Sequence, residues 1–257
     1  MSETGAAAAV RLNRYLAMCG VAARRKADEM IAAGRVTVNG AIPPPGGLMV
    51  NPGDAVELDG RPVTVARAHR YYAVNKPVGY LSAVSDKTSR PLVTRLLPPV
   101  ARDGGLNPVG RLDLRSRGLI LLTDDGELSF RLQHPRHHVE KEYRVDARGE
   151  LGEDALRELR GGIDLDEGRT NPAVFEVLDR GARRVRLRVV LRQGWKRQLR
   201  RSFAAVGATV LDLQRVRVGP LELGDLAEGK ARPLGPDEVA ALRAAVDLAP
   251  TAAGTGQ

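Results

Sequence analysis

The sequence predicts an α+β protein, because segments with the period of a strand and segments with the period of a helix succeed one another along its 257 residues. Basic and apolar residues alternate strictly over 184–189, which is typical of a strand with one face against a core. Leu199, Phe203 and Val206 recur at the spacing of a buried helical stripe. The chain has no glycine-rich turn of the kind that binds dinucleotides or nucleoside triphosphates, so neither of those folds is favoured.

The same periods place the elements along the chain. Near the N-terminus, two helices are ended by Gly20 and Gly34, and the strand after them leads into the turn Asn39-Gly40. The run 119–122 is continuously apolar and is stopped by Asp124-Asp125-Gly126, which predicts a strand buried on both faces. Helices are expected at about 12–17, 24–33, 127–133, 153–160, 196–206 and 236–246, and strands at about 36–38, 71–75, 119–122, 141–145, 173–178 and 184–191.

Composition restricts the partners of the protein. A formal net charge of +9 on a chain with 43% hydrophobic residues indicates a globular protein that meets a polyanion, either nucleic acid or an anionic membrane surface. No apolar run approaches the ~20 residues of a spanning helix, which disfavours an integral membrane protein. Residues 1–9 lack the regions of a secretion signal, and the one cysteine, Cys19, cannot form an internal disulfide. A cytoplasmic protein is therefore expected, with Cys19 packed in a core.

One carboxylate, Asp113, stands in a group of cations between Gly110 and Gly118. The cations are Arg111, Arg115 and Arg117. On a loop that enters a rigid strand, they can keep a carboxylate ionised and well placed for chemistry. Alternatively, Asp113 caps a turn and the arginines only hold it there, and composition alone favours this alternative.

A basic stretch runs from Arg183 to Arg201, where nine lysines and arginines occur over nineteen positions without an acidic residue. Such a stretch is either a solvated face or a surface for a polyanion, and the complete absence of acids favours the second. His134, His137 and His138 also lie close together in the sequence, but their spacing matches no zinc pattern. The sequence therefore predicts no metal site.

The Asp113 segment carries a resemblance to a known family. It resembles the signature motif of the pseudouridine synthases, in particular of the branch that modifies bacterial ribosomal RNA. The matching residues are Gly110-Arg111-Leu112-Asp113, followed by Ser116, Gly118 and 119–126. Further matches follow in the family's order: the turn Lys76-Pro77-x-Gly79, the pair Lys141-x-Tyr143, the segment 193–202 and a pattern over 210–234. The resemblance covers roughly residues 10–246. It implies a catalytic domain on an antiparallel sheet, in which the Lys76 turn places a loop beside the site.

The N-terminal part resembles the S4 RNA-binding module over roughly 10–60. The likeness rests on Arg11-Leu12, on Gly20 before Arg24-Arg25, and on Gly34-Arg35-Val36 leading to Val38-Asn39-Gly40. Charge alone would also fit a small basic hairpin with a solvated face, since arginines on helices can contact phosphates without reading bases. The resemblance implies an S4-like α/β domain at 10–67, a catalytic domain at 68–248, and disordered tails at 1–9 and 249–257. The residues expected to contact RNA in the first domain are Arg11, Arg24, Arg25, Lys26 and Arg35.

In the catalytic domain, the resemblance assigns roles to four residues. Asp113 acts at the sugar of the target uridine, as a nucleophile or as a base, and Tyr143 lies against the target base. Arg200 pairs with Asp113 within ~4 Å, as an ion pair requires. Arg111 fills the place that the target base leaves when it flips out of its stack.

Two more arginines, Arg197 and Arg201, are expected to contact RNA. Gln193 and Ser202 depart from the family, which usually has glutamate and methionine there. A local ion pair at Gln193 is therefore in doubt, and a packing contact at Ser202 is expected to be looser.

The implied reaction converts a specific uridine of ribosomal RNA, preferably in the large subunit, to pseudouridine: the N1–C1′ bond breaks and a C5–C1′ bond forms. It requires no cofactor and no metal. The expected partner is ribosomal RNA or a ribosome-assembly intermediate, without a membrane, and the chain is expected to be a monomer. The alternative is a non-catalytic ribosome-binding or assembly factor, which would not need Asp113, Tyr143 and Arg200 together. An RNA methyltransferase would need a cofactor site that the glycine pattern does not show.

Overall fold

The computed structural model describes residues 9–44, 47–63, 69–86, 89–102, 105–181 and 183–249. The chain divides into two compact units, one of residues up to Arg70 with 103–105 and 124–126, and one of the remaining residues from Tyr71 onward. The predicted domain boundary at residue 67 and nearly all of the two predicted tails lie outside the described residues. Each unit is considered by itself.

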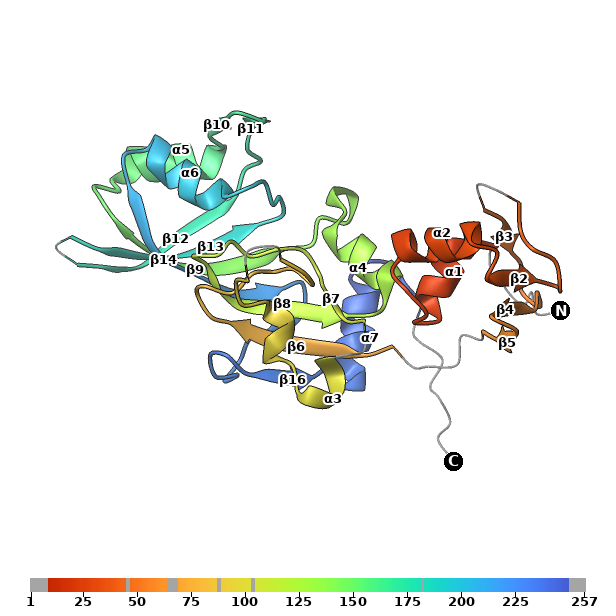
Figure 1. Cartoon of the computed structure of the whole chain (residues 1–257). Helices are drawn as coiled ribbons and strands as arrows, with labels where there is room; N and C mark the ends of the chain where they lie inside the picture. The colour runs from red at the N-terminus through yellow and green to blue at the C-terminus, as the bar shows by residue number, and fades with distance from the viewer. Residues whose placement is uncertain are drawn as a thin grey trace, which may run out of the picture. The chain divides into compact units, whose positions relative to one another are not determined.

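The N-terminal unit consists of two short helices and small sheets (Figure 1). Its elements are β1 (Val10–Arg11), α1 (Leu12–Met18), α2 (Arg24–Ala32), β2 (Val36–Val38), β3 (Met49–Val50), β4 (Val56–Leu58) and β5 (Arg61–Pro62). As predicted, Gly20 and Gly34 follow the helices with positive φ angles of 71° and 69°. Asn39 and Gly40 turn the chain with φ angles of 52° and 79°. The predicted helices and turn are therefore confirmed.

Cys19 packs against the core of the N-terminal unit, where Leu12 and Leu16 are fully buried. Burial raises the pKa of the Cys19 thiol to about 11, and a hydrogen bond with Tyr15 opposes this shift only in part. The thiol is therefore protonated at neutral pH and is a poor nucleophile, as expected for a core cysteine.

The larger unit is built on a nine-stranded sheet with the order β12-β13-β9-β14-β8-β6-β16, to which β7 and β15 add at the edges of β8 and β14. The strands are β6 (Tyr71–Lys76), β7 (Asn107–Pro108), β8 (Arg117–Thr123), β9 (Lys141–Arg148), β12 (Val174–Arg180), β13 (Val185–Leu191), β14 (Thr209–Val218), β15 (Leu221–Glu222) and β16 (Ala231–Pro233). A separate hairpin joins β10 (Asp164–Leu165) to β11 (Gly168–Arg169). Among these pairs only β8 and β14 are parallel. The expected antiparallel sheet is therefore confirmed apart from this one pair.

Strand β8 is covered on both faces, as its apolar run predicted. Leu119 and Leu121 pack with α4 (Gly126–Gln133) and α7 (Pro236–Ala244). Ile120 and Leu122 pack on the opposite side, with the 3₁₀ helix η1 (Val93–Leu96) and α3 (Pro99–Arg102) (Figure 1). Because successive side chains of a strand point to opposite faces, both sets become buried.

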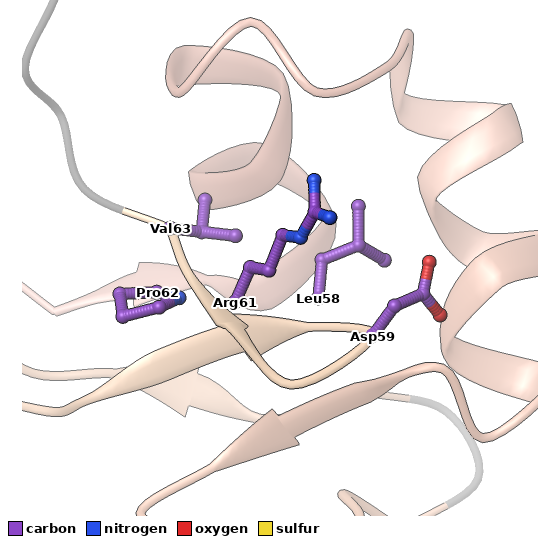
Figure 2. A pocket seen from close by; sticks show the side chains of 5 residues that line it. All are labelled: Leu58, Asp59, Arg61, Pro62 and Val63. Atoms are coloured by element: carbon purple, nitrogen blue, oxygen red, sulfur yellow. The ribbon is translucent and has the colours of Figure 1, made fainter.

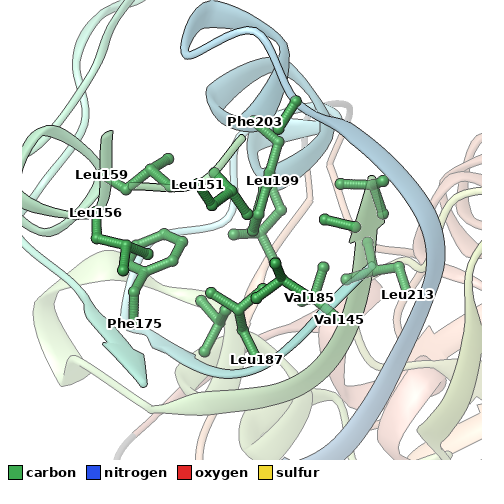
Figure 3. Packing of buried hydrophobic residues seen from close by; sticks show 14 of the residues in the cluster. Val145, Leu151, Leu156, Leu159, Phe175, Val185, Leu187, Leu199, Phe203 and Leu213 are labelled. Carbon is green, nitrogen blue, oxygen red and sulfur yellow. The ribbon is translucent and has the colours of Figure 1, made fainter. Parts of the chain in front are cut away.

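The other half of the sheet carries α5 (Glu153–Gly161) and α6 (Gln198–Ala205) on one face (Figure 1). Leucines of both helices meet the apolar side chains of β9, β12, β13 and β14 in one core (Figure 3). The rings of Phe175 and Phe203 pack within it at a centroid distance of 5.9 Å. Helix α6 begins two residues later than predicted, because Arg197 has a left-handed backbone with φ 51°.

Gly118 is where β8 meets β14. It lies opposite Arg215 in the parallel pair and has a φ of +105°. A Cβ at this position would lie 2.2 Å from the carbonyl oxygen and 2.7 Å from the nitrogen of Arg215. Both the backbone angle and the close approach therefore require glycine.

Replacement of Gly118 by alanine is expected to lower the free energy of unfolding by roughly 3 kcal/mol, because β8 and β14 must separate and a strained φ is imposed. Urea unfolding measures this change. The control is Gly161→Ala at the end of α5, where a Cβ would meet nothing within 4 Å and alanine should stabilise the helix by roughly 0.5–1 kcal/mol. Equal stability of the two variants would contradict the close approach.

Candidate active site

The sheet aligns four residues of the family motifs in one row. Lys76 on β6 lies opposite Gly118 on β8, Gly118 lies opposite Arg215 on β14, and Arg215 lies opposite Tyr143 on β9. Directly opposite residues of adjacent strands are close neighbours. The row therefore brings together segments that lie far apart in the sequence.

Asp113 lies on the loop that enters this row from β7 to β8. The loop is fastened by backbone hydrogen bonds: Ser116 donates to the Asp113 carbonyl at 3.0 Å, and Gly79 donates to the Leu114 carbonyl at 2.8 Å. Ser82 Oγ lies 3.1 Å from the carbonyl oxygen and 3.0 Å from the nitrogen of Leu112. The Asp113 side chain is half-buried and makes no ion pair with another described residue. A rigid loop thus presents a carboxylate that is not neutralised by direct contact.

Lys76 is fully buried beneath this loop. Its Nζ donates to the carbonyls of Pro77 and Tyr80 at 2.9 and 3.0 Å, which closes the turn and agrees with the expected structural task. Burial and, to a smaller extent, the charge of Arg215 lower the pKa of Lys76 to about 8, while Asp113 opposes the shift. Asp113 and Lys76 are therefore close enough to interact through space.

Two further cations of the site were not predicted as site residues. Arg215 is 5% exposed, and its Nε donates to the Leu119 carbonyl at 2.8 Å. The pKa of Lys141 is lowered to about 8 by burial and by the charge of Arg215. The pair Lys141-x-Tyr143 contained a signal for the lysine, but nothing in the sequence indicates that Arg215 would face the site.

Arg200 lies beside the Asp113 loop but does not form the predicted ion pair with Asp113. Its two Nη groups donate to the carbonyls of Arg115 and Val210, at 2.8 and 3.1 Å. Burial and the charge of Arg197 lower the pKa of Arg200, while Asp113 opposes that shift. The prediction was wrong because backbone carbonyls, which sequence patterns do not reveal, take the guanidinium donors. Arg200 binds the loop rather than the carboxylate.

Arg117, one of the three arginines near Asp113 in the sequence, is directed elsewhere. Its Nη2 lies 2.7 Å from Asp212 on β14, and its Nη1 lies 3.5 Å from Glu228. This ion pair joins β8 to β14. Arg111 and Arg115 are exposed on the loop itself.

Tyr143 is half-buried on β9 and packs against the cores on both halves of the sheet. Close to Asp113 in the sequence, the hydroxyl of Ser116 is buried and has no hydrogen-bond partner among the described residues. The site thus contains an aromatic ring, a carboxylate and one unsatisfied hydroxyl.

Much of the basic stretch 183–201 lies beside acidic residues of neighbouring strands and loops, a pairing that the sequence did not predict. Arg188 lies 3.0 Å from Glu142, and Arg192 lies 3.2 Å from Glu140. The remaining pairs among the described residues are Arg184 and Arg186 with Asp146, Arg188 with Glu176, and Arg201 with Asp166 and Glu167. Cross-strand pairing, invisible in a one-dimensional stretch, therefore neutralises much of this charge.

The departures at Gln193 and Ser202 are accommodated locally. Gln193 Oε1 accepts hydrogen bonds from the backbone of Asn171 at 3.1 Å and from Gln198 at 3.2 Å, where a glutamate could have formed an ion pair. Ser202 is 4% exposed on the buried face of α6.

The predicted RNA contacts of the N-terminal unit are exposed, namely Arg11, Arg24, Arg25, Lys26 and Arg35. Lys26 lies 2.7 Å from Glu29, and Arg35 Nε donates to Asp59 at 3.0 Å. A hollow beside Asp59 is lined by residues of β4 and β5 and their surroundings (Figure 2). It contains none of the predicted catalytic residues and is not the active site.

Among the described residues, no group of three or more histidine, cysteine, aspartate and glutamate side chains could hold a metal ion. Every helix in the described part of the chain is too short or too polar to cross a membrane.

Comparison with known proteins defines the class of the protein. Residues 10–43 match the S4 domain, and residues 70–205 match the RNA pseudouridylate synthase domain. Because the second match spans more than half of the chain, the chain belongs to the RNA pseudouridylate synthase family, and it is an enzyme that isomerises uridine in RNA to pseudouridine.

Relatives share most of its length. The chain is 38% identical to a ribosomal large subunit pseudouridine synthase B of Bacillus subtilis, over 92% of this chain and 97% of the relative. It is 35% identical to a ribosomal small subunit pseudouridine synthase A of Yersinia pestis, over 91% and 99%. A crystal structure of a pseudouridylate synthase superposes with a TM-score of 0.66 at 30% identity, over 91% of this chain and 99% of that chain.

The buried lysine makes a testable contribution to stability. The folded pKa of Lys76, about 8, is below its ordinary value of 10.5. The unfolded chain therefore binds more protons between these values, and Lys76 makes stability rise with pH across that window.

Relative to Lys76→Met, the wild type is expected to gain up to about 1.4 kcal/mol per pH unit between about pH 8 and 10. Urea unfolding at several pH values measures the difference. Lys230→Met, at an exposed position, is the control and should retain the wild-type slope. A constant difference between wild type and Lys76→Met would contradict the burial of a titrating ammonium.

Proposed function

We propose that the protein acts on a uridine of ribosomal RNA, preferably of the large subunit, and that Asp113 is its catalytic residue. The observation that supports the role of Asp113 most directly is its half-buried carboxylate, held on a fastened loop without an ion pair to a described residue. Relatives named for both ribosomal subunits support ribosomal RNA as the substrate. The slightly higher identity to the large-subunit relative favours that subunit.

In the proposed reaction, the carboxylate of Asp113 either attacks ribose C1′ or removes a proton from the sugar, and the N1–C1′ bond breaks. The freed uracil carries the electron pair of that bond and turns, and C5 then bonds to C1′. In the first route this step displaces the Asp113 oxygen from C1′, and in the second the sugar proton returns to the carbon that it left. The C5 proton is then lost to a base, and N1 takes up a proton. Lys76, Lys141 and Arg215 supply positive potential where the uracil is negative. The Tyr143 ring lies against the base and limits how it turns.

RNA reaches the site as a flipped nucleotide, and the exposed Arg111 occupies the space that the base leaves. Phosphates are contacted by four arginines that form no ion pair within the described chain, namely Arg197, Arg11, Arg24 and Arg25. Each ion-paired candidate also contacts a phosphate, once its carboxylate partner is displaced. Those paired candidates are Lys26, Arg35 and Arg201. The unpaired arginines should therefore contribute more to affinity than the paired residues.

The enzyme is proposed to act as a monomer in the cytoplasm, where ribosomal RNA is modified. Lys76, Asp113, Tyr143 and Arg215 all come from one chain, so the site needs no second copy. The alternative of a non-catalytic assembly factor does not account for a carboxylate and buried cations around one row of the sheet.

Arg200 is proposed to position the Asp113 loop through the Arg115 carbonyl. Arg200→Ala is expected to lower the single-turnover rate about 100-fold, because a displacement of about 1 Å at a catalytic group has effects of that size. RNA affinity should fall much less. Arg157→Ala, at an exposed arginine of α5 whose guanidinium binds Asp154, is the control. If both variants lost the same rate, the effect would belong to the loss of an arginine in general and not to the loop.

The function itself is tested by deleting the gene and mapping pseudouridines in both ribosomal RNAs by mass spectrometry. One large-subunit pseudouridine should disappear. Wild type and Asp225→Asn, at an exposed carboxylate, should restore it, whereas folded Asp113→Asn should not. Loss of a site in transfer RNA alone would reject ribosomal RNA as the substrate, and restoration by Asp113→Asn would reject the catalytic assignment.

A further inference from the structure

We propose that the end of α4 and the 3₁₀ helix η2 (Pro135–His137) form a stacking platform for single-stranded RNA next to the target uridine. The platform consists of Phe130, His134, His137 and Arg136. This proposal rests on the proposed function, because the ligand of the platform is the RNA strand that flanks the uridine bound at Asp113.

Phe130 is the exposed ring of the platform, whereas His134 and His137 are half-buried. Phe130 is 54% exposed, and Leu128 and Leu132 are the residues that bury the packing face of α4. The ring of His134 lies 5.3 Å from that of Phe130, and the ring of His137 lies 6.4 Å from that of His134. Phe130 is therefore not needed for the core, yet it contacts a row of rings and remains more than half exposed.

Hydrogen bonds orient the two imidazoles. The backbone N–H of Arg136 donates to Nδ1 of His134 at 3.2 Å, and Nε of Arg136 donates to Nε2 of His137 at 3.0 Å. These hydrogen bonds fix the orientation of the two rings relative to Arg136. Imidazole rings stack on nucleobases as other aromatic side chains do.

The platform adjoins the catalytic loop. Gln133, the last residue of α4, lies beside Gly110, where a Cβ would be 3.8 Å from both Cγ and Oε1 of the glutamine. Gly110 is followed by Arg111 and comes three residues before Asp113. Nucleotides on either side of a uridine at Asp113 therefore pass close to η2.

Charge and polarity favour RNA over a protein as the occupant. Phe130 is the only exposed large hydrophobic residue of α4 and η2 within the described chain, which is too little apolar surface for a protein interface. Arg136 is exposed beside it, with guanidinium nitrogens left to bind a phosphate. Alternating rings and cations are how proteins bind single strands, since bases stack while the backbone meets positive charge.

The test uses the full-length enzyme and a single-stranded RNA that contains 2-aminopurine, whose fluorescence is quenched when it stacks. Wild type should quench the probe saturably. Phe130→Ala should weaken binding about tenfold, within the range measured for loss of one stacked base, and should lose most of the quenching. Phe130→Tyr should restore both. Leu178→Ala, at an exposed position on β12, is the matched control and should behave as wild type.

Arg136→Ala separates the phosphate contact from stacking. It should reduce the slope of log affinity against log salt by about 0.7, the value for one phosphate of a single strand. Phe130→Ala should leave that slope unchanged. With substrate RNA, Phe130→Ala should raise KM more than it lowers kcat.

Absence of saturable quenching with wild type, or equal quenching by wild type and Phe130→Ala, would overturn the platform. Binding of another protein at Phe130 with no effect of the variant on RNA would overturn it as well. These outcomes are independent of the pseudouridine maps, so failure of the platform and failure of the ribosomal RNA assignment can be told apart.

Discussion

The close passage of two backbones at Gly118 is the constraint on which the site depends. β8 and β14 run parallel there, and no Cβ fits between Gly118 and the Arg215 carbonyl. At this contact, Nε of Arg215 donates a hydrogen bond to the carbonyl of Leu119, which lies 96 positions away in the sequence. On one side it fixes the end of the Asp113 loop, and on the other it fixes Arg215 and, one strand further, Tyr143. Backbone packing, more than any contact between side chains, therefore assembles the site.

Ion pairs across the sheet determine which charged side chains remain available to bind RNA or to react. Arg188 is shared by Glu142 and Glu176, and Arg117 is bound to Asp212, so these cations hold strands together. Asp113 lies among cations and yet has no such partner in the described chain. A carboxylate that is surrounded by positive potential, but not hydrogen-bonded to it, stays available to react. The net charge of the chain therefore overstates the surface that is open to RNA.

Structural features that depend on local periodicity were predicted correctly from the sequence. Features that depend on contacts between distant backbone segments were not predicted. The apolar run 119–122 and the turn Asn39-Gly40 behaved as expected, because periodicity and turn chemistry act over a few residues. The motif match also located the Asp113 loop. The parallel pairing at Gly118 and the carbonyl partners of Arg200 could not be predicted, since each depends on backbone brought together only by the folded sheet.

Burial of the cations lowers the stability of the fold, but their charge favours the proposed reaction. Burial and the charge of Arg215 lower the pKa of both Lys76 and Lys141, so the fold disfavours the charged forms of these two lysines. An anion beside them removes that penalty. A uracil whose bond to the sugar is breaking is such an anion, and it becomes more negative as the reaction proceeds. In the proposed site, the cations would therefore stabilise the transition state more than the bound uridine, which is the condition for accelerating the reaction rather than only binding the substrate.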